Sequence, residues 1–442
     1  MPMLNHVQTR LVPLLVSRSL YWRKFRFYRT LRQTLAIIFP FILLGNFVQA
    51  LSLSVFTPNG FFAQIYHLDR VIPAYNEINR VLNLVVAATF NVLAVATVYF
   101  AAKFMARTYL KDDNLAGLTG VTSFLMFNVN FTQSTSQDFF RIQNFGYRGM
   151  FFAFWLGVLI GWLFKFSKSP DQTGPSQFMS ISELTEHSLR NMWLIFAIIL
   201  ASLAISFGIN FVSPEGIIGL SYIGFRLPVG GLSSHVSIRL ALVTMLNTIM
   251  WWAGIEGPLN ALNQFGSSPT ATANLNYALE HHDLYHVPNP ITINTVYYPF
   301  ANFGGVGMLL ALIIATLLIA KTKSARKIAG LSLFPSLVNI PNPMLVGYPV
   351  IMNPILLLPF AIIPLVTQAI AWTFIRLHLM PPVVYTVPST TPGPLIAFLG
   401  TNGNWVAFFV SALCLVVAVL IYLPFVWLSQ TVNLEAIKEE RA

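Results

Sequence analysis

The chain has 442 residues, of which 55% are hydrophobic and only 9% are charged, and its formal net charge is +11. An ordinary soluble domain carries about 25% charged residues. This composition therefore excludes a soluble globular protein, and the uncharged runs of about 17 to 25 residues are long enough to cross a lipid bilayer as helices.

The apolar runs predict an all-α polytopic membrane protein. Two further stretches, 328–344 and 390–400, are apolar but broken by Pro and Gly, which favours re-entrant hairpins over complete crossings. We expect about ten transmembrane helices plus two re-entrant hairpins. The predicted helices are, in chain order, 35–55, 82–104, 115–131, 150–166, 192–212, 240–257, 303–320, 349–374 and 407–427.

Cationic residues predict the orientation, because loops rich in Lys and Arg stay in the cytoplasm. Basic residues interleaved with aromatic ones precede the first apolar run, which indicates a helix lying on anionic lipid headgroups; a nucleic-acid patch is the disfavoured alternative. The first run lacks a cleavage site and is expected to remain as a helix. Both termini are predicted to be cytoplasmic. The basic positions are Arg18, Arg23, Lys24, Arg26, Arg29 and Arg32, then Lys103, Arg107 and Lys111, Lys165 and Lys168, and Lys321, Lys323, Arg326 and Lys327.

The sequence offers little for a metal or a cofactor. Its single cysteine, Cys414, lies inside the last apolar run, which predicts a small core residue and excludes a cysteine metal cluster. A phosphate-binding Gly-rich loop and a nucleophile elbow are both missing, so no cofactor is predicted. The histidines of 281–286 lie in a polar connection, where a solvated segment is favoured over a metal site.

The most informative polar group is Glu256, which ends an apolar run directly before Gly257 and Pro258. A carboxylate at such a helix break can meet backbone donors and substrate hydroxyls, and intramembrane charges are functional candidates because their burial is costly. The alternative is a carboxylate at the membrane interface that faces water. Glu256 is the candidate catalytic residue.

A second polar cluster spans 339–354, where several prolines and Gly347 prevent one regular helix. Amides beside aromatic faces would hold a neutral polyol, although the same asparagines could instead cap broken helices. The Pro-rich turn 387–394 adds hydroxyls, with the same two interpretations. The candidate substrate-binding residues are Asn342, Asn339, Asn260, Thr390, Thr391 and Trp252.

Three motifs carry a resemblance to a known family. They are Leu-Ser-Leu-Phe-Pro-Ser-Leu-Val-Asn-Ile at 331–340, Gly-Tyr-Pro-Val-Ile-Met-Asn-Pro-Ile-Leu-Leu-Leu-Pro-Phe at 347–360 and Val-Pro-Ser-Thr-Thr-Pro at 387–392. With them, the stretch 299–427 resembles the membrane subunit, enzyme IIC, of lactose/cellobiose phosphotransferase systems, and weaker similarity extends toward the N-terminus.

The resemblance implies a homodimeric permease of the bacterial cell membrane that imports a disaccharide of the cellobiose, lactose or chitobiose class by rigid-body alternating access. A separate cytosolic enzyme IIB would phosphorylate the sugar from its cysteine. The implied domains are a basic amphipathic segment (1–33), an interface and dimerisation domain (34–235), a substrate-binding transport domain with the hairpins (236–430) and a cytoplasmic tail (431–442).

The chain departs from this family at four positions. Pro341 and Ser389 replace the usual Asn and Trp. Members usually have His where Glu256 stands and Glu where Asn342 stands. The carboxylate of the pair is therefore at the first position in this chain, and at the second in the family. Glu256 could accept the hydroxyl proton while Asn342 holds the sugar oxygen. The alternative is a non-phosphorylating facilitator, sensor or receptor, in which Glu256 is protonated and only donates a hydrogen bond.

Overall fold

The structure is a computed structural model that describes residues 12–131, 139–167, 185–186, 189–213, 236–261, 268–348 and 350–441. These residues fall into two compact units. Unit 1 comprises 12–17, 43–86 and the residues from 236 onward, and unit 2 comprises 18–42 and the residues from 87 to 213. In the described part the only β pairing is an isolated bridge between Val129 and Phe140, which confirms the all-α prediction.

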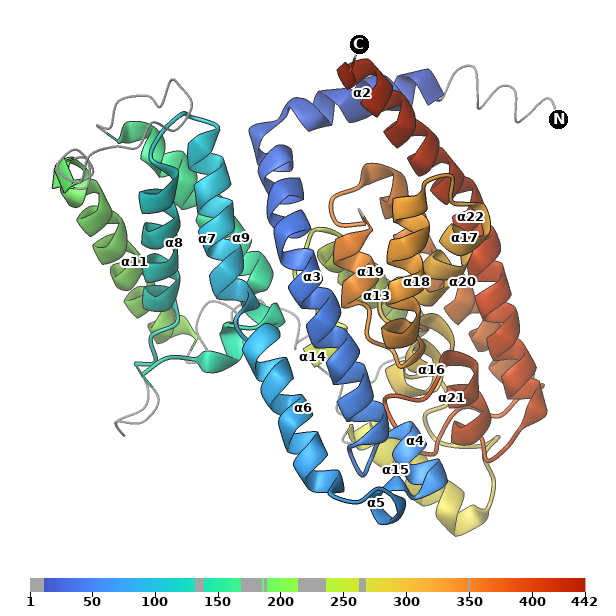
Figure 1. The fold of residues 1–442 in the computed structure, drawn as a ribbon. Coiled ribbons are helices and arrows are strands. Elements are labelled where there is room, and N and C mark those ends of the chain that lie inside the picture. Colours follow the sequence, from blue (N-terminus) through green and yellow to red (C-terminus); the bar gives the residue numbers. More distant parts are fainter. Residues whose placement is uncertain are drawn as a thin grey trace. The chain divides into compact units, whose positions relative to one another are not determined.

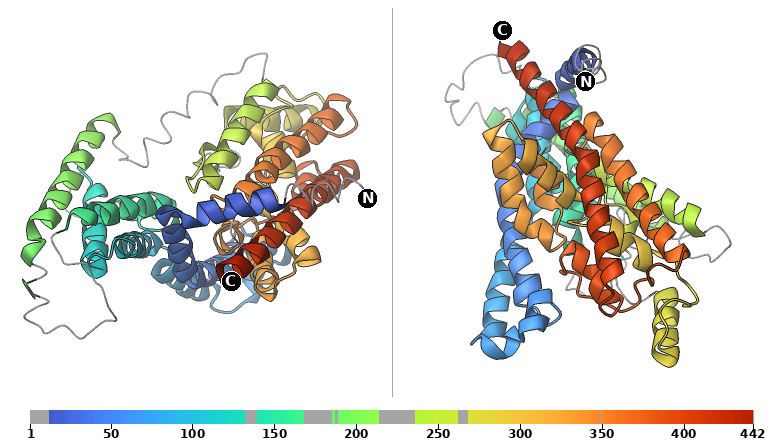
Figure 2. Two further views of the ribbon diagram at one scale, coloured as in Figure 1. Left: turned by 90° about the horizontal axis from the view of Figure 1, so that it is seen from above. Right: turned by 90° about the vertical axis from the view of Figure 1, so that its right-hand side faces the viewer.

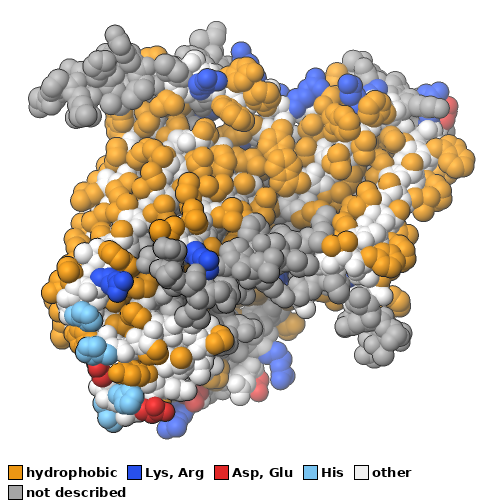
Figure 3. Space-filling view, turned by 180° about the vertical axis from the view of Figure 1, so that it is seen from behind, with side chains coloured by type: hydrophobic (Ala, Val, Ile, Leu, Met, Phe, Trp, Pro, Cys, Tyr) orange, Lys and Arg blue, Asp and Glu red, His pale blue; other side chains and the backbone are white. Residues whose placement is uncertain are grey.

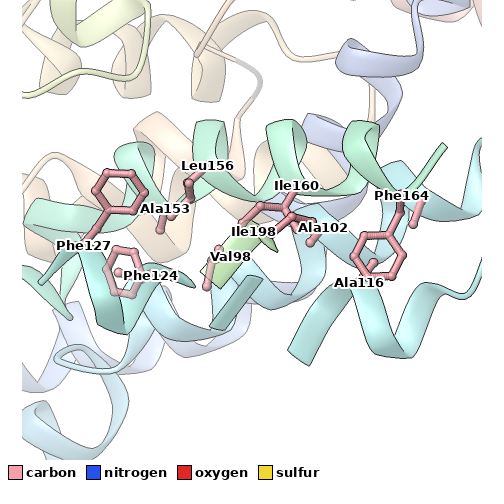
Figure 4. Packing of buried hydrophobic residues seen from close by; sticks show 12 residues of the cluster. Val98, Ala102, Ala116, Phe124, Phe127, Ala153, Leu156, Ile160, Phe164 and Ile198 are labelled. Atoms are coloured by element: carbon pink, nitrogen blue, oxygen red, sulfur yellow. The ribbon is translucent and has the colours of Figure 1, made fainter. Parts of the chain in front are cut away.

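Unit 2 is a bundle in which α7 contacts both α8 and α9, and α8 contacts α11 (Figure 1). Its core is built from alanines and larger apolar side chains, including Phe124, Ile160 and Phe164, as Figure 4 shows. The first half of α3 also belongs to this unit. The helices are α7 (Leu93–Arg107), α8 (Asp113–Phe127), α9 (Tyr147–Leu163), α11 (Met192–Val212), α3 (Arg26–Val55) and the short turns η2 (Ile142–Asn144) and η3 (Phe164–Phe166).

Small residues allow α7 and α9 to approach closely. A Cβ added at Gly157 would lie 2.7 Å from the carbonyl oxygen of Val98, and one at Gly161 would lie 2.6 Å from that of Ala102. Because hydrocarbon tails are as apolar as the side chains, close packing rather than hydrophobic burial is what holds such helices together. The glycines of α9 are therefore packing residues.

Unit 1 is organised around the long helix α22, which contacts α17, α20 and α21; Figure 2 shows it in two further views. Cys414 is buried on α22, and its Sγ lies 3.7 Å from the carbonyl oxygen of Thr367 on α20, as expected for a small core residue. The longer helices are α13 (Val236–Trp252), α15 (Pro269–His281), α17 (Leu309–Ile319), α18 (Lys323–Leu337), α20 (Pro354–Arg376), α21 (Gly393–Gly400) and α22 (Trp405–Arg441).

Short elements connect these helices, and α2 and α6 complete the described secondary structure. They are α2 (Val12–Lys24), α4 (Phe61–Tyr66), α5 (Leu68–Val71), α6 (Tyr75–Thr89), α14 (Pro258–Ala261), η4 (Ile293–Tyr297), α16 (Tyr298–Ala301) and α19 (Asn342–Gly347).

Six helices of the described part are long and apolar enough to span a membrane. Large hydrophobic side chains are exposed along them, such as Trp193 and Phe211 on α11, and orange side chains cover much of the face drawn in Figure 3. Such a surface suits lipid as the surrounding medium. The spans are Arg26–Val55, Tyr75–Arg107, Tyr147–Phe166, Met192–Val212, Pro354–Arg376 and Trp405–Lys438.

The predicted helix 303–320 is shorter in the structure and begins at Leu309. The preceding residues Gly304, Gly305, Gly307 and Met308 all have positive φ, between 53° and 96°. This left-handed backbone is cheap for glycine and cannot continue an α-helix. The predicted helix 240–257 likewise ends at Trp252, ahead of Gly254 with φ of 81°.

Candidate functional site

The broken segments of unit 1 meet at a place that we call the loop junction, defined as residues 302–308, 338–342 and 388–393. Asn339 holds it together. Its Nδ2 donates to the carbonyl oxygens of Ser389 at 3.0 Å and Thr391 at 2.8 Å, and its Oδ1 accepts from the amide of Gly304 at 3.2 Å. One side chain thus ties three stretches that are far apart in sequence.

The local backbone explains why asparagine occupies this position. Helix α18 ends at Leu337, and Asn339 has φ of 65°. Asparagine tolerates the left-handed conformation better than most residues, because its short polar side chain bonds locally. A Cβ at Gly305 would lie 2.5 Å from Cβ of Pro341, so the glycine-rich stretch can pass against the turn only without a side chain there.

The two threonines of the junction have different surroundings. The hydroxyl oxygen of Thr390 accepts a hydrogen bond from the amide of Phe61 at 3.0 Å and so caps the start of α4. The Oγ1 of Thr391 is buried and has no hydrogen-bond partner among the described residues. Of these two predicted substrate-binding residues, only Thr391 therefore keeps an unused polar atom.

Asn342 is paired with a residue that the sequence analysis did not select. Its Nδ2 donates to Oδ1 of Asn46 on α3 at 3.1 Å, and both residues are buried. The sequence feature that could have identified Asn46 is its polar amide in the middle of the apolar run 35–55. An amide buried there needs a partner, because an unmatched polar group in an apolar setting is costly.

Glu256 lies in the non-helical turn between α13 and α14 and is half-buried. Asn247 of α13 shapes this turn: its Oδ1 accepts from the amide of Leu259 at 3.2 Å, and its Nδ2 donates to the hydroxyl of Tyr297 at 3.3 Å. A Cβ at Gly257 would lie 2.2 Å from Oδ1 of Asn247, so this position has no room for a side chain. The turn that carries Glu256 is rigidly specified.

Trp252 joins the end of α13 to the segment before α20. Its Nε1 donates to the carbonyl oxygen of Asn353 at 2.8 Å, and its own carbonyl oxygen accepts from the amide of Met352 at 2.9 Å. Asn353 in turn caps α20 through the amide of Ile355. The backbone of Asn260 belongs to α14, and its side chain lies outside the described part of the structure, as does residue 349.

The histidine-rich connection forms a local pair at the end of α15. Nδ1 of His286 lies 2.6 Å from Oδ2 of Asp283, and its ring stacks on His378 with centroids 5.7 Å apart. The hydrogen bond from His286 lowers the pKa of the Asp283 carboxyl below its ordinary value. Within the described ranges no group of three or more His, Cys, Asp and Glu side chains is arranged to hold a metal ion.

Comparison with known proteins gives the family context. The model of the family "Phosphotransferase system, EIIC" matches residues 32–364, which is more than half of the chain. A cellobiose-specific EIIC component of Lactococcus lactis is 41% identical over 29% of this chain, and a lactose-specific EIICB component of Lacticaseibacillus casei is 30% identical over 50%. The alignments span only 26% and 38% of those two relatives' own lengths.

Among solved structures, the chain is similar to the IIC component of the N,N'-diacetylchitobiose-specific phosphotransferase system. The sequence identity is 21%, the TM-score is 0.41, and the match covers 97% of this chain and 99% of the other. On the strength of the family match over 32–364, this chain is a multi-pass membrane protein that belongs to the EIIC family of the phosphotransferase system.

Proposed function

We propose that the chain is the sugar-translocating subunit of a phosphoenolpyruvate-dependent phosphotransferase system, and that it imports a disaccharide of the cellobiose, lactose or chitobiose class. Membership of the EIIC family carries the proposal, and the names of the relatives point to β-linked disaccharides. The interrupted helices of unit 1 support it further, because non-helical backbone at membrane depth is tolerated where it lines a binding cavity.

The chemistry proposed for Glu256 is acceptance of a proton. A sugar hydroxyl attacks the phosphoryl group carried by the cysteine of enzyme IIB, a phosphorus–oxygen bond forms, and the phosphorus–sulfur bond breaks to release the cysteine as a thiolate. The hydroxyl proton passes to the Glu256 carboxylate, which the turn after α13 holds in a fixed, half-buried position. Asn342 offers its amide to the sugar oxygen from α19.

We assign Asn339 and Thr390 to positioning rather than to direct sugar contact. Both amide protons of Asn339 are already donated to backbone carbonyl oxygens, and Thr390 already accepts from Phe61. Asn339 fixes the loop 388–393 against the Gly-rich stretch, and Thr390 fixes the same loop against the start of α4. Trp252 contributes its ring face, since its Nε1 is engaged with Asn353.

The proposed partner in the cytosol is a phosphorylated enzyme IIB component. The name of the lactose-specific relative combines both components as EIICB, which supports the pairing of an EIIC chain with an EIIB component. Coupled import needs the sugar and the phosphoryl donor to meet at the cytoplasmic side.

For the topology we propose about ten crossings, two re-entrant hairpins and cytoplasmic termini. An eight-residue helix such as α21 is about 12 Å long, far short of the roughly 30 Å of a hydrocarbon core. Lys321, at the head of the basic cluster, donates from its backbone amide to Gln430 of α22 at 2.7 Å and from Nζ to Thr431. The C-terminal end of α22 therefore lies beside cations that the positive-inside rule puts in the cytoplasm.

We further propose a homodimer, with 34–235 as its interface domain and 236–430 as the moving transport domain. The division of roles is taken from the family resemblance, and it implies that cross-links within 236–430 block transport while cross-links between copies through 34–235 do not.

The proposal is tested by uptake into vesicles loaded with phosphorylated enzyme IIB. Radiolabelled cellobiose, lactose and chitobiose are supplied outside, and free and phosphorylated sugar are separated inside. The proposal predicts accumulation of at least one of the three as its phosphate, with none when enzyme IIB is unphosphorylated. Free sugar alone would instead favour the non-phosphorylating facilitator.

A further inference from the structure

Two buried polar atoms at the loop junction have no hydrogen-bond partner among the described residues. One is Oδ1 of Asn302, which follows helix α16, and the other is Oγ1 of Thr391, in the Pro-rich turn before α21. Each is shielded from solvent. Natural structures rarely keep such atoms unmatched, because a buried polar group without a partner loses its hydration and gains nothing.

These two atoms come from stretches that are packed against each other. A Cβ added at Gly393 would lie 2.7 Å from Cδ1 of Phe303, so the residue directly after Asn302 lies against the residue two positions after Thr391. Asn339 reinforces the arrangement by bonding both the amide of Gly304 and the carbonyl oxygen of Thr391. The junction thus presents one amide acceptor and one hydroxyl on two facing loops.

The hydroxyls of the neighbouring residues Thr390 and Thr401 have hydrogen-bond partners, so the unmatched hydroxyl of Thr391 differs from those around it. Thr390 caps α4, and Oγ1 of Thr401 donates to the carbonyl oxygen of Ala397 at 2.7 Å. Ser389 of the same turn is exposed, so Thr391 carries the one buried hydroxyl of residues 388–393 that has no partner among the described residues. A sugar hydroxyl both donates and accepts, so it complements an amide oxygen and a threonine hydroxyl at once.

We infer that Asn302 and Thr391 form a sugar-hydroxyl contact of the transport site, with Asn302 as a binding residue that the sequence analysis did not select. The inference rests on the proposed function. Because both atoms are closed to solvent here, the sugar reaches them when the loop 388–393 separates from 302–308, and the two amide hydrogen bonds of Asn339 are the bonds that must open.

Matched variants test this assignment. Thr391→Val removes only the unmatched hydroxyl and keeps the shape, so it is expected to leave the unfolding midpoint unchanged or raised, while sugar affinity falls about 3- to 10-fold, the size of one lost hydrogen bond. Asn302→Leu is expected to weaken binding by a similar factor. Thr401→Val is the control, because its hydroxyl is engaged within α21, and it should keep the affinity of the unchanged protein.

Binding is measured by calorimetry on the full chain in detergent, with whichever of cellobiose, lactose or chitobiose the vesicle assay selects. A loss of affinity in both variants without a loss of stability supports the inference. If the unchanged protein binds the sugar and both variants bind equally well, the two atoms hold water or nothing, and the inference is overturned. If the unchanged protein binds none of the three sugars, the proposed function itself fails, and this inference fails with it.

Discussion

Asn339 gives the sharpest stability prediction, because its side chain and its backbone contribute separately. The side chain makes three hydrogen bonds at the loop junction, and the residue has φ of 65°. At about 1 kcal/mol per bond, Asn339→Gly should cost about 3 kcal/mol of unfolding free energy. Asn339→Ala should cost about 1 kcal/mol more, because alanine is strained in the left-handed region.

Asn402 supplies a matched control for this series. It has φ of 57°, is exposed, and its side chain makes no hydrogen bond to other described residues. Asn402→Ala should therefore cost only the conformational part, about 1 kcal/mol, and Asn402→Gly close to nothing. The four variants are compared by denaturant titration of the purified protein in one detergent. Equal stability of Asn339→Ala and Asn402→Ala would refute the assignment of Asn339 as the residue that ties the junction.

Two further predictions concern packing and the buried amide pair. Gly161→Leu should destabilise unit 2 by about 1 to 3 kcal/mol, because the added side chain forces α7 and α9 apart. Gly208→Ala should be neutral or slightly stabilising, because nothing lies within 4 Å of the added Cβ. Thermal unfolding of both variants checks this prediction, and equal effects of the two substitutions would contradict it. Asn46→Leu and Asn342→Leu should each cost about 1 to 3 kcal/mol by leaving the other amide unmatched, and the double variant should cost less than the sum. Strict additivity in that double-mutant cycle would show that the pair is not coupled.

The sequence predicted the long helices well because lipid leaves the backbone few choices. A spanning segment must satisfy its own amides and carbonyls, so uncharged runs such as 192–212 and 407–427 become helices, here α11 and part of α22. The run 303–320 reads as equally apolar, yet its first third is a glycine-rich turn. Hydropathy does not distinguish a glycine that packs within a helix from one that has positive φ.

The sequence analysis selected Asn342, Thr390 and Thr391 as candidates, but it selected neither Asn302 nor the residues with which Asn342 and Thr390 form hydrogen bonds. Asn342 stands out beside its prolines, whereas Asn46 lies 296 residues earlier in an ordinary apolar run. Thr390 and Thr391 are identical neighbours, and only the fold shows that one caps α4 while the other keeps an unmatched hydroxyl. Such pairings depend on which distant loops meet, and the residue types alone do not specify that.

Glu256 is the residue on which the proposed coupling of import to phosphorylation depends. The direct measurement compares the rate of phosphosugar formation by the unchanged protein and by Glu256→Gln, in vesicles that contain phosphorylated enzyme IIB. Glu280→Gln, on α15, is the control for loss of one carboxylate.

We predict that Glu256→Gln lowers that rate by about 100-fold or more, as expected for a lost proton acceptor, while sugar binding changes only a few-fold. Phosphosugar formation at the unchanged rate in Glu256→Gln would contradict the account, because it would show that the reaction needs no carboxylate at this position.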